Sequence, residues 1–295
     1  MRILVLGATG FVGRHLTSTL RTAGHTVVRG VRKPSQSEDI KVDFCKDTTK
    51  EVWLPRLANV DVVINAVGVL RDTIKQPMKQ ILQQTPIALF SACQECGVKR
   101  IVQISALGID NGIETPYFQN RRAPEAYLAS FPETNRWLIL RPSVIYGEDG
   151  VSAKLFLTQA SLAIHPLPEG GRQCLQPVHI DDICSVVIRW LDDPDAQNQT
   201  VDAVGLEVTD LRGMLDSYRQ QLRKSKALHI TIPSWLIGLF AQAGDFIPTS
   251  PLCSDTLTML NAGNTGNDEA FTKLLGRSPK SYRQFIQSGS DFESP

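Results

Sequence analysis

Short apolar runs alternate with longer amphipathic stretches through the first half of the chain. The runs are too short for helices and are typical of buried strands. They cover residues 3–6, 26–31, 40–44, 60–65, 98–105 and 137–140. Between them, apolar residues recur at helical spacing, as Val12, Leu16 and Leu20 do ahead of Gly24, a residue suited to end a helix. This alternation predicts an α/β fold built on a doubly wound parallel sheet.

The pattern also divides the chain into two parts. Residues 74–97 are predicted to be helical, with turns at two prolines. The clean alternation stops after Gly147, where a loop rich in proline and glycine leads to a helix over 183–191. We therefore expect one domain over residues 1–147 and a smaller C-terminal, substrate-side subdomain over residues 148–295, from which some segments return to the sheet.

Three glycines, Gly7, Gly10 and Gly13, separate the first apolar run from the first helix. Gly7 allows a tight turn, Gly10 leaves the backbone open to a pyrophosphate, and Gly13 lets the helix pack closely on the strand. Free N–H groups at the helix start would face the anion. The spacing is G-x-x-G-x-x-G, one residue different from the general fingerprint, but the strand–turn–helix context fits it. The pattern predicts a Rossmann-type dinucleotide site; the alternative is a turn that holds nothing.

The end of the second apolar run indicates which dinucleotide is preferred. An acidic residue at this position would bind the ribose of NAD, whereas an arginine accommodates the additional phosphate of NADP. Arg29, Arg32 and Lys33 stand here without a carboxylate among them. We therefore predict a preference for NADP(H), with Arg32 as the selecting residue, while NAD(H) stays possible and a solvated basic turn is the alternative.

Polar or small residues end four of the predicted strands. They are Gly7, Arg32, Asn65 and Ser105. Because ligands of parallel sheets bind at the carboxyl ends of the strands, these residues are predicted to line one crevice.

Composition and charge narrow the class of protein. The 295 residues include 42% hydrophobic and 21% charged side chains, which is ordinary for a globular protein. A net charge of +1 gives no electrostatic reason to expect a nucleic acid or an anionic membrane as partner. No apolar run reaches the roughly 18 residues of a membrane span. A strand starting at the second residue leaves no room for a targeting peptide, so we expect a soluble, cytoplasmic protein.

The cysteines and histidines do not predict a metal or redox site. The six cysteines are scattered and do not form a disulfide framework. Cys93 and Cys96 form a C-x-x-C pair, but no second pair or nearby histidine completes it, which favours two cysteines of one helix. His179 with Asp181 and Asp182 is compatible with metal binding or acid/base chemistry, although a polar hinge ahead of a helix is the simpler interpretation.

Several segments together resemble the short-chain dehydrogenase/reductase superfamily, in its extended or atypical branch. The segments that carry the resemblance are residues 7–13 (G-A-T-G-F-V-G), 104–106 (I-S-A), Tyr117 with its helix, 140–147 (L-R-P-S-V-I-Y-G) and 177–182 (P-V-H-I-D-D). Residues 105–108 and 274–281 (L-L-G-R-S-P-K-S) are similar to the group that contains the nucleotide-binding accessory subunit of respiratory complex I and its bacterial relatives. A protein partner is therefore possible.

The resemblance implies roles for individual residues. Ser105 would orient a substrate carbonyl and Tyr117 would be the general acid/base. The residues implied at the cofactor are Thr9, Gly10, Phe11 and Val12 for the pyrophosphate, Arg32 for the adenosine phosphate, Asp43 and Phe44 for the adenine, and Ala66, Val67 and Gly68 for the ribose, together with Gly7, Gly13 and Arg141.

One position departs from the pattern of the superfamily. A tyrosine hydroxyl has a reference pKa near 10 and needs a neighbouring cation to exchange protons near neutral pH. The family supplies a lysine four residues after the tyrosine, and this chain has Arg121, which is larger, planar and forked. Two hypotheses follow: an NADP(H)-dependent oxidoreductase or epimerase that acts on an unknown small molecule, or a non-catalytic NADP(H)-binding protein with a structural, assembly or redox-sensing role.

Overall fold

The structure is a computed structural model that describes residues 1–247, 250 and 252–286. It divides into two compact units. The first comprises Met1–Pro142 and Ile183–Asp202, and the second comprises Ser143–Asp182 and Ala203–Pro295. In the part of the chain that is described, every helix is too short or too polar to traverse a lipid bilayer.

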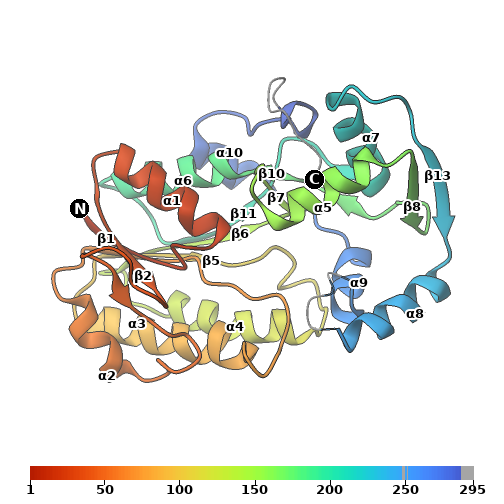
Figure 1. Cartoon of the computed structure of the whole chain (residues 1–295). Helices are drawn as coiled ribbons and strands as arrows, with labels where there is room; N and C mark the ends of the chain where they lie inside the picture. Colours follow the sequence, from red (N-terminus) through yellow and green to blue (C-terminus); the bar gives the residue numbers. More distant parts are fainter. Residues whose placement is uncertain (248–249, 251, 287–295) are drawn as a thin grey trace. The chain divides into compact units, whose positions relative to one another are not determined.

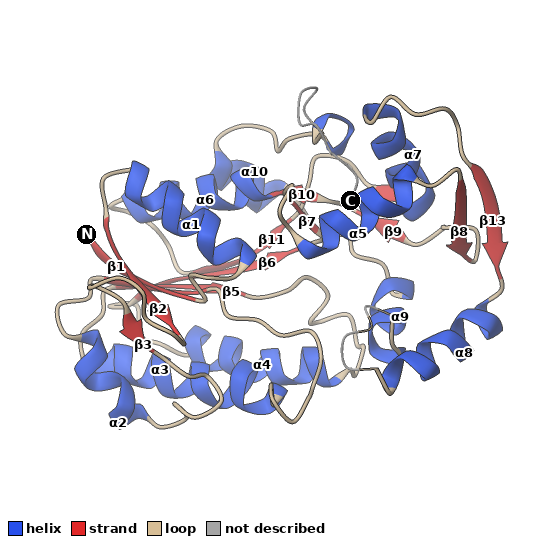
Figure 2. Cartoon of the chain, viewed as in Figure 1, coloured by secondary structure: helices blue, strands red, loops and turns tan. Residues whose placement is uncertain are grey.

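Seven strands form the central sheet of the first unit, in the order β11-β6-β5-β4-β1-β2-β3 (Figure 2). Their bounds are β1 Arg2–Leu6, β2 Thr26–Val31, β3 Ile40–Lys41, β4 Val62–Asn65, β5 Arg100–Ile104, β6 Arg136–Pro142 and β11 Gln199–Ala203. In this spatial order, the six strands β6, β5, β4, β1, β2 and β3 each pair in parallel with the next. The chain order reverses between β1 and β4, which is where open sheets of this type bind ligands.

Helices cover both faces of this sheet. Figure 1 shows α1 and α6 on one face and α2, α3 and α4 on the other. Their bounds are α1 Phe11–Thr22, α2 Lys50–Trp53, α3 Thr85–Glu95, α4 Pro116–Ala129 and α6 Ile180–Asp192. The apolar strand residues that this packing shields include Leu4, Val28, Val63 and Ile101, which are completely buried. Strands buried on both sides read as continuous apolar runs, which explains the sequence pattern. The predicted doubly wound α/β fold is confirmed.

Some predicted element bounds are wrong. The third strand ends at Lys41, because the chain then turns so that the Asp43 amide donates to the Asp47 carboxylate. Residues 74–97 do not form one helix. Thr73 and Gln76 close a tight turn through two mutual backbone hydrogen bonds.

Regular helix in this region starts only after that turn. A π-helical segment, η2, covers Gln80–Gln84 and runs directly into α3. Pro86 lies in the first turn of α3, a position that suits proline. Because η2 runs directly into this turn, however, the proline ring and its missing N–H prevent one regular α-helix from continuing through both segments. A widened turn ahead of the proline is the local solution to this conflict.

The described residues of the second unit form three two-stranded sheets, which pair β10 with β7, β12 with β9 and β13 with β8. Its strands are β7 Ile145–Tyr146, β8 Ile164–Pro168, β9 Cys174–Leu175, β10 Val178–His179, β12 Thr209–Asp210 and β13 Leu228–Ile232. Its helices are α5 Val151–Ser161, α7 Leu211–Gln221, α8 Ser234–Asp245, α9 Ser254–Asn261 and α10 Glu269–Leu275. A separate apolar core centred on Tyr146, Leu167, Met214 and Tyr218 holds these elements together.

Candidate nucleotide-binding site

The glycine turn joins β1 to α1 with backbone packed directly on backbone. Gly7 has a φ of +75°, and a Cβ there would lie 2.8 Å from the carbonyl oxygen of Ala66. A Cβ on Gly13 would overlap the carbonyl oxygen of Gly7. The Gly10 amide closes the turn by donating to Gly7 O over 2.8 Å. Only glycine satisfies both the positive φ and the close approach at Gly7.

The N-terminus of α1 is open to an anion. Gly10 is its N-cap and supplies no side-chain cap, and no acidic residue stands in the first turn. The first N–H groups of a helix have no acceptor within the helix, and the helix dipole makes this end positive. Thr9 and Gly10 are exposed, and Phe11 and Val12 are half-buried. The turn therefore has the chemistry of a pyrophosphate cradle.

The loop after β4 meets this turn at the reversal of strand order. The Ala66 amide donates to Leu6 O over 3.1 Å. The buried side chain of Asn65 holds this loop in place. Its Nδ2 donates to Gln103 Oε1 over 2.8 Å, and its Oδ1 accepts from the Val67 amide at 3.2 Å. Small residues at 66 and 68 leave the backbone accessible here. The structure thus brings the predicted segments 7–13 and 66–68 together.

Arg121 connects this loop with β5 and α4. Its Nη1 donates to the carbonyl oxygen of Ile104 over 3.2 Å, and its guanidinium carbon lies 4.8 Å from the ring centroid of Tyr117. A Cβ on Gly68 would lie 2.9 Å from Arg121 Nη2. The side chain is buried, and its Nε has no hydrogen-bond partner among the described residues. Arg121 thus lies next to three segments that were predicted for the site: residues 66–68, residues 104–106 and Tyr117.

Ser105 and Tyr117 both precede Arg121 in the chain, and Arg121 contacts the Tyr117 ring and the carbonyl of Ile104, the residue before Ser105. Ser105 follows β5, its amide donates to Leu140 O over 2.7 Å, and its side chain is 5% exposed. Its hydroxyl is buried and makes no hydrogen bond within the described part of the chain. Tyr117 lies in the first turn of α4, which Thr115 caps. Buried hydroxyls normally have partners, so the unpartnered hydroxyl is unusual, and the role of Ser105 toward a substrate stays a prediction.

The basic residues at the end of β2 are used differently from one another. Arg29 binds the Asp39 carboxylate through Nε at 2.8 Å and Nη2 at 2.7 Å, and these hydrogen bonds hold the pKa of Asp39 well below its usual range. A carboxylate therefore does lie at this strand end, because the chain folds back. Both of its oxygens are occupied, since the Ser35 and Gln36 amides also donate to it. Arg32 is exposed, and its charge lies close enough to Cys45 to oppose the burial that raises the pKa of that thiol.

The remaining predicted cofactor residues have partners of their own. The Phe44 ring is buried edge-on against Trp53, so this residue can present only its backbone to a ligand. The half-buried Asp43 lies beside it.

Arg141 is held by two carboxylates. It donates to Glu125 Oε2 at 2.6 Å through Nη2 and at 3.0 Å through Nε, while Nη1 lies 2.5 Å from Asp110 Oδ2. The structure therefore ties Arg141 to α4, and its role at a cofactor stays a prediction.

The sequence model of the family described as "NAD dependent epimerase/dehydratase family" matches residues 3–204. This match covers well over half of the chain. The chain belongs to this family. Membership confirms the superfamily resemblance predicted from the sequence.

Curated relatives of this epimerase/dehydratase protein include subunits of respiratory complex I. NADH dehydrogenase [ubiquinone] 1 alpha subcomplex subunit 9 of Mus musculus is 27% identical over 66% of this chain and 54% of its own length. The NADH-ubiquinone oxidoreductase 40 kDa subunit of Neurospora crassa is 25% identical over 79% and 63%. Photosystem II assembly factor Ycf39 of Synechocystis is 31% identical over 44% and 41%. The chain thus spans about half the length of these relatives.

Solved structures of epimerase-type proteins share the fold. The human epimerase family protein SDR39U1, solved with NADPH, gives a TM-score of 0.75 at 19% identity and covers 97% of both chains. MoeE5, solved with UDP-glucuronic acid and NAD, gives a TM-score of 0.72 at 16% identity over 97% of this chain and 96% of that one. At this identity the likeness establishes the fold alone.

Two segments that carry the family resemblance, residues 177–182 and 274–281, meet in the second unit. Asp182 is completely buried at the start of α6, and its carboxylate accepts from Arg277 Nη2 at 2.6 Å and from the Lys280 amide at 2.7 Å. Lys280 Nζ lies 2.6 Å from Asp181 Oδ2. The histidine before them, His179, lies 3.4 Å from Asp181 through Nδ1. These contacts form a structural clamp at the start of α6, and the polar hinge stays a prediction.

Proposed function

We propose that the first unit binds a nicotinamide dinucleotide with a preference for NADP(H). The observation that carries this proposal is the turn at Gly7 and Gly13, which presents the uncapped start of α1 at the reversal of strand order. The hydrogen-bond donors of this site fit NADP(H), because backbone N–H groups bind a pyrophosphate and the exposed Arg32 can bind a 2′-phosphate. Structural neighbours solved with NADPH or NAD are compatible with either dinucleotide.

An Arg32→Ala variant tests the preference. A charge-assisted hydrogen bond to a phosphate contributes about 1.5–3 kcal/mol, so the affinity for NADPH is expected to fall about tenfold to a hundredfold. The affinity for NADH is expected to stay unchanged, because NADH has no 2′-phosphate. Calorimetric titration of both nucleotides measures the two effects.

Lys33→Ala is the matched control, since Lys33 is equally exposed and directly adjacent. It is expected to reduce NADPH affinity only slightly. Equal loss in both variants would assign the preference to general positive charge, and equal NADPH and NADH affinity in the wild type would remove the proposed role of Arg32.

We further propose that Ser105, Tyr117 and Arg121 support a reduction, oxidation or epimerisation of a carbonyl or alcohol. The dinucleotide would supply the hydride chemistry at its nicotinamide ring. Ser105 would hold the substrate oxygen through its unpartnered hydroxyl, and Tyr117 would transfer the proton at that oxygen through its phenol group. Arg121 would keep a positive charge beside the Tyr117 ring and the loop at Gly68.

A second function, dinucleotide binding without catalysis, is favoured by the contacts of Arg121. Its guanidinium lies over the face of the Tyr117 ring and donates to a backbone carbonyl, so it is engaged in packing. The named relatives, subunits of respiratory complex I and an assembly factor, support a role in a larger protein assembly. Here the bound nucleotide would stabilise the first unit for a protein partner.

Replacing Tyr117 by phenylalanine separates the two functions. If Tyr117 is the acid/base, turnover is expected to fall about 10²- to 10⁴-fold, with NADPH affinity unchanged because the ring and its packing remain. Net reduction or oxidation of aldehydes, ketones and alcohols is followed by nicotinamide absorbance. Epimerisation of nucleotide sugars, which leaves the cofactor unchanged after each cycle, is followed by chromatographic separation of the epimers.

Arg121→Lys accompanies this variant. A lysine restores the residue typical of the superfamily, so turnover is expected to persist or rise. Wild-type turnover retained in Tyr117→Phe would exclude Tyr117 as the acid/base. A wild type and an Arg121→Lys variant that both bind NADPH and convert none of these substrates would favour the non-catalytic function.

A further inference from the structure

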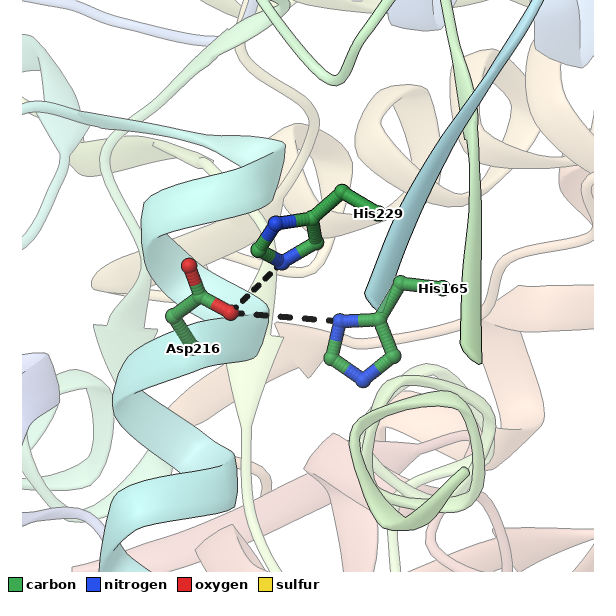
Figure 3. Close-up of side chains that lie close together, drawn as sticks. All are labelled: His165, Asp216 and His229. Carbon is green, nitrogen blue, oxygen red and sulfur yellow. Dashed lines mark hydrogen bonds and ion pairs between the residues drawn. The ribbon is translucent and has the colours of Figure 1, made fainter. Parts of the chain in front are cut away.

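Two histidines and an aspartate of the second unit meet in a cluster outside the nucleotide site. His165 lies on β8 and His229 on β13, and the two are direct partners in the parallel register of these strands. Partners in register project to the same face of a sheet. Asp216 approaches that face from α7, and Figure 3 shows the carboxylate directed toward both imidazole rings.

The donor atoms of the cluster already lie at near-ligand spacing. His229 Nε2 is 2.8 Å from Asp216 Oδ1, and His165 Nδ1 is 3.9 Å from the same oxygen. One donor atom from each residue lies within 4.8 Å of the other two. Zinc bonds of about 2.0–2.1 Å in a tetrahedral arrangement separate two donors by about 3.3 Å. The two distances to Oδ1 bracket this spacing, so small side-chain adjustments would bring the three donors to one ion.

His165 is buried without a well-formed hydrogen bond in the described part of the chain. Its side chain is completely buried. Neither ring nitrogen makes a hydrogen bond of normal geometry with the described residues, although the Ala160 backbone lies close enough to act on its pKa. Burying an imidazole without a partner is unfavourable, and a metal ion is one ligand that would compensate for it. The unpartnered ring faces Asp216 and thus points to a ligand.

We propose that His165, Asp216 and His229 bind a divalent transition-metal ion of the zinc type. Two imidazole nitrogens and one carboxylate oxygen are ligands that zinc accepts, and three protein ligands leave a fourth position for water. Asp216 is 43% exposed and His229 18% exposed, so the ion can enter from solvent. Arg212 Nε lies 4.0 Å from Asp216 Oδ2, which leaves the other oxygen, Oδ1, facing the histidines. The ion would fasten β8, β13 and α7 to one another.

A chelator-treated full chain titrated with Co²⁺ and Zn²⁺ tests the site. We expect one Co²⁺ per chain with absorption bands of nitrogen and oxygen coordination and without a thiolate band, and displacement of Co²⁺ by Zn²⁺. Asp216→Asn and His229→Gln are expected to weaken binding of both ions at least about tenfold, because changes even around metal ligands cost tenfold to a hundredfold. His165 is left unchanged, since it is part of the packed interior.

Asp195→Asn is the matched control, because it removes an exposed carboxylate of the first unit. It is expected to bind Co²⁺ like the wild type. Circular dichroism and thermal unfolding verify that each variant is folded. The proposal is overturned if the wild type binds no Co²⁺, if binding is equal in all variants, or if a thiolate band shows that cysteines hold the ion.

Discussion

A Gly13→Ala variant is expected to lose dinucleotide binding and to unfold at a clearly lower temperature than the wild type. The added Cβ would overlap the carbonyl oxygen of Gly7, a backbone atom that cannot rotate away as a side chain can. Helix α1 would have to move off β1, at a cost of about 3 kcal/mol, since overpacking of a well-packed interior costs about 1–3 kcal/mol. The same movement displaces the N–H groups that would face the pyrophosphate. Calorimetric titration with NADPH and thermal unfolding measure the two effects.

Gly10→Val tests binding with less disturbance of the fold. A Cβ at this position would lie 3.2 Å from Gly7 O, which a small adjustment can relieve, but the side chain would occupy the approach of the phosphates. NADPH affinity is expected to fall at least a hundredfold. Gly238→Ala in α8 is the control, because no atom lies within 4 Å of its added Cβ. Unchanged affinity in Gly10→Val would place the nucleotide elsewhere.

An Asp182→Asn variant is expected to destabilise the second unit by about 2–3 kcal/mol, the range for losing a charged hydrogen-bond acceptor in a buried site. The carboxylate is completely buried and joins the start of α6 to Arg277 and to the Lys280 amide. An amide retains the volume but removes the charge and turns one acceptor into a donor. A domain of this size loses about 2–4 °C per kcal/mol, so thermal unfolding should show a decrease of about 5–10 °C.

Asp181→Asn is the matched control for this variant. Its ion pair with Lys280 is 2.6 Å long, but the Asp181 side chain is 54% exposed. Exposed pairs contribute only about 0–1 kcal/mol because water and salt screen them. A similar loss of stability in both variants would show that burial of the Asp182 carboxylate is not what stabilises the clamp.

The departure at position 121 acquires a different meaning in three dimensions. In the sequence, Arg121 is a replacement that weakens the comparison with catalytic members of the superfamily. In the structure it donates to the Ile104 carbonyl and lies over the Tyr117 ring, and it fills the space that a side chain at position 68 would need. A guanidinium with five donors can serve packing and a ligand at once, so the residue does not by itself decide between catalysis and binding.

The sheet and the glycine turn were predictable because their signals are local. A buried parallel strand needs a continuous apolar run, and a turn with positive φ and close packing needs glycine. Residues 3–13 carry both signals in sequence order. The break near residue 74 was missed, since the reciprocal hydrogen bonds of Thr73 and Gln76 have no compositional signature.

The side-chain pairings within each unit were not predictable, because the partners are separated along the chain. Asp39 folds back onto Arg29, Glu125 holds Arg141 across 16 residues, and Arg277 reaches Asp182 across 95. No spacing rule links such pairs. The pairing of His165 with His229 depends on the register of two strands in a small sheet, and a register shift by one residue would place the rings on opposite faces.

The sequence by itself determined the class of fold, the position of the dinucleotide turn and the polar residues that end the strands, because each depends on residue type within a few positions. Only the tertiary structure decided which of these residues are free to bind a ligand and which are engaged by other side chains. Within the described part of the chain it left Arg32 exposed and the Ser105 hydroxyl without a hydrogen-bond partner, while it engaged Arg29 and Arg141 with carboxylates. Availability depends on what else packs nearby, and packing brings together residues whose separation along the chain carries no signal.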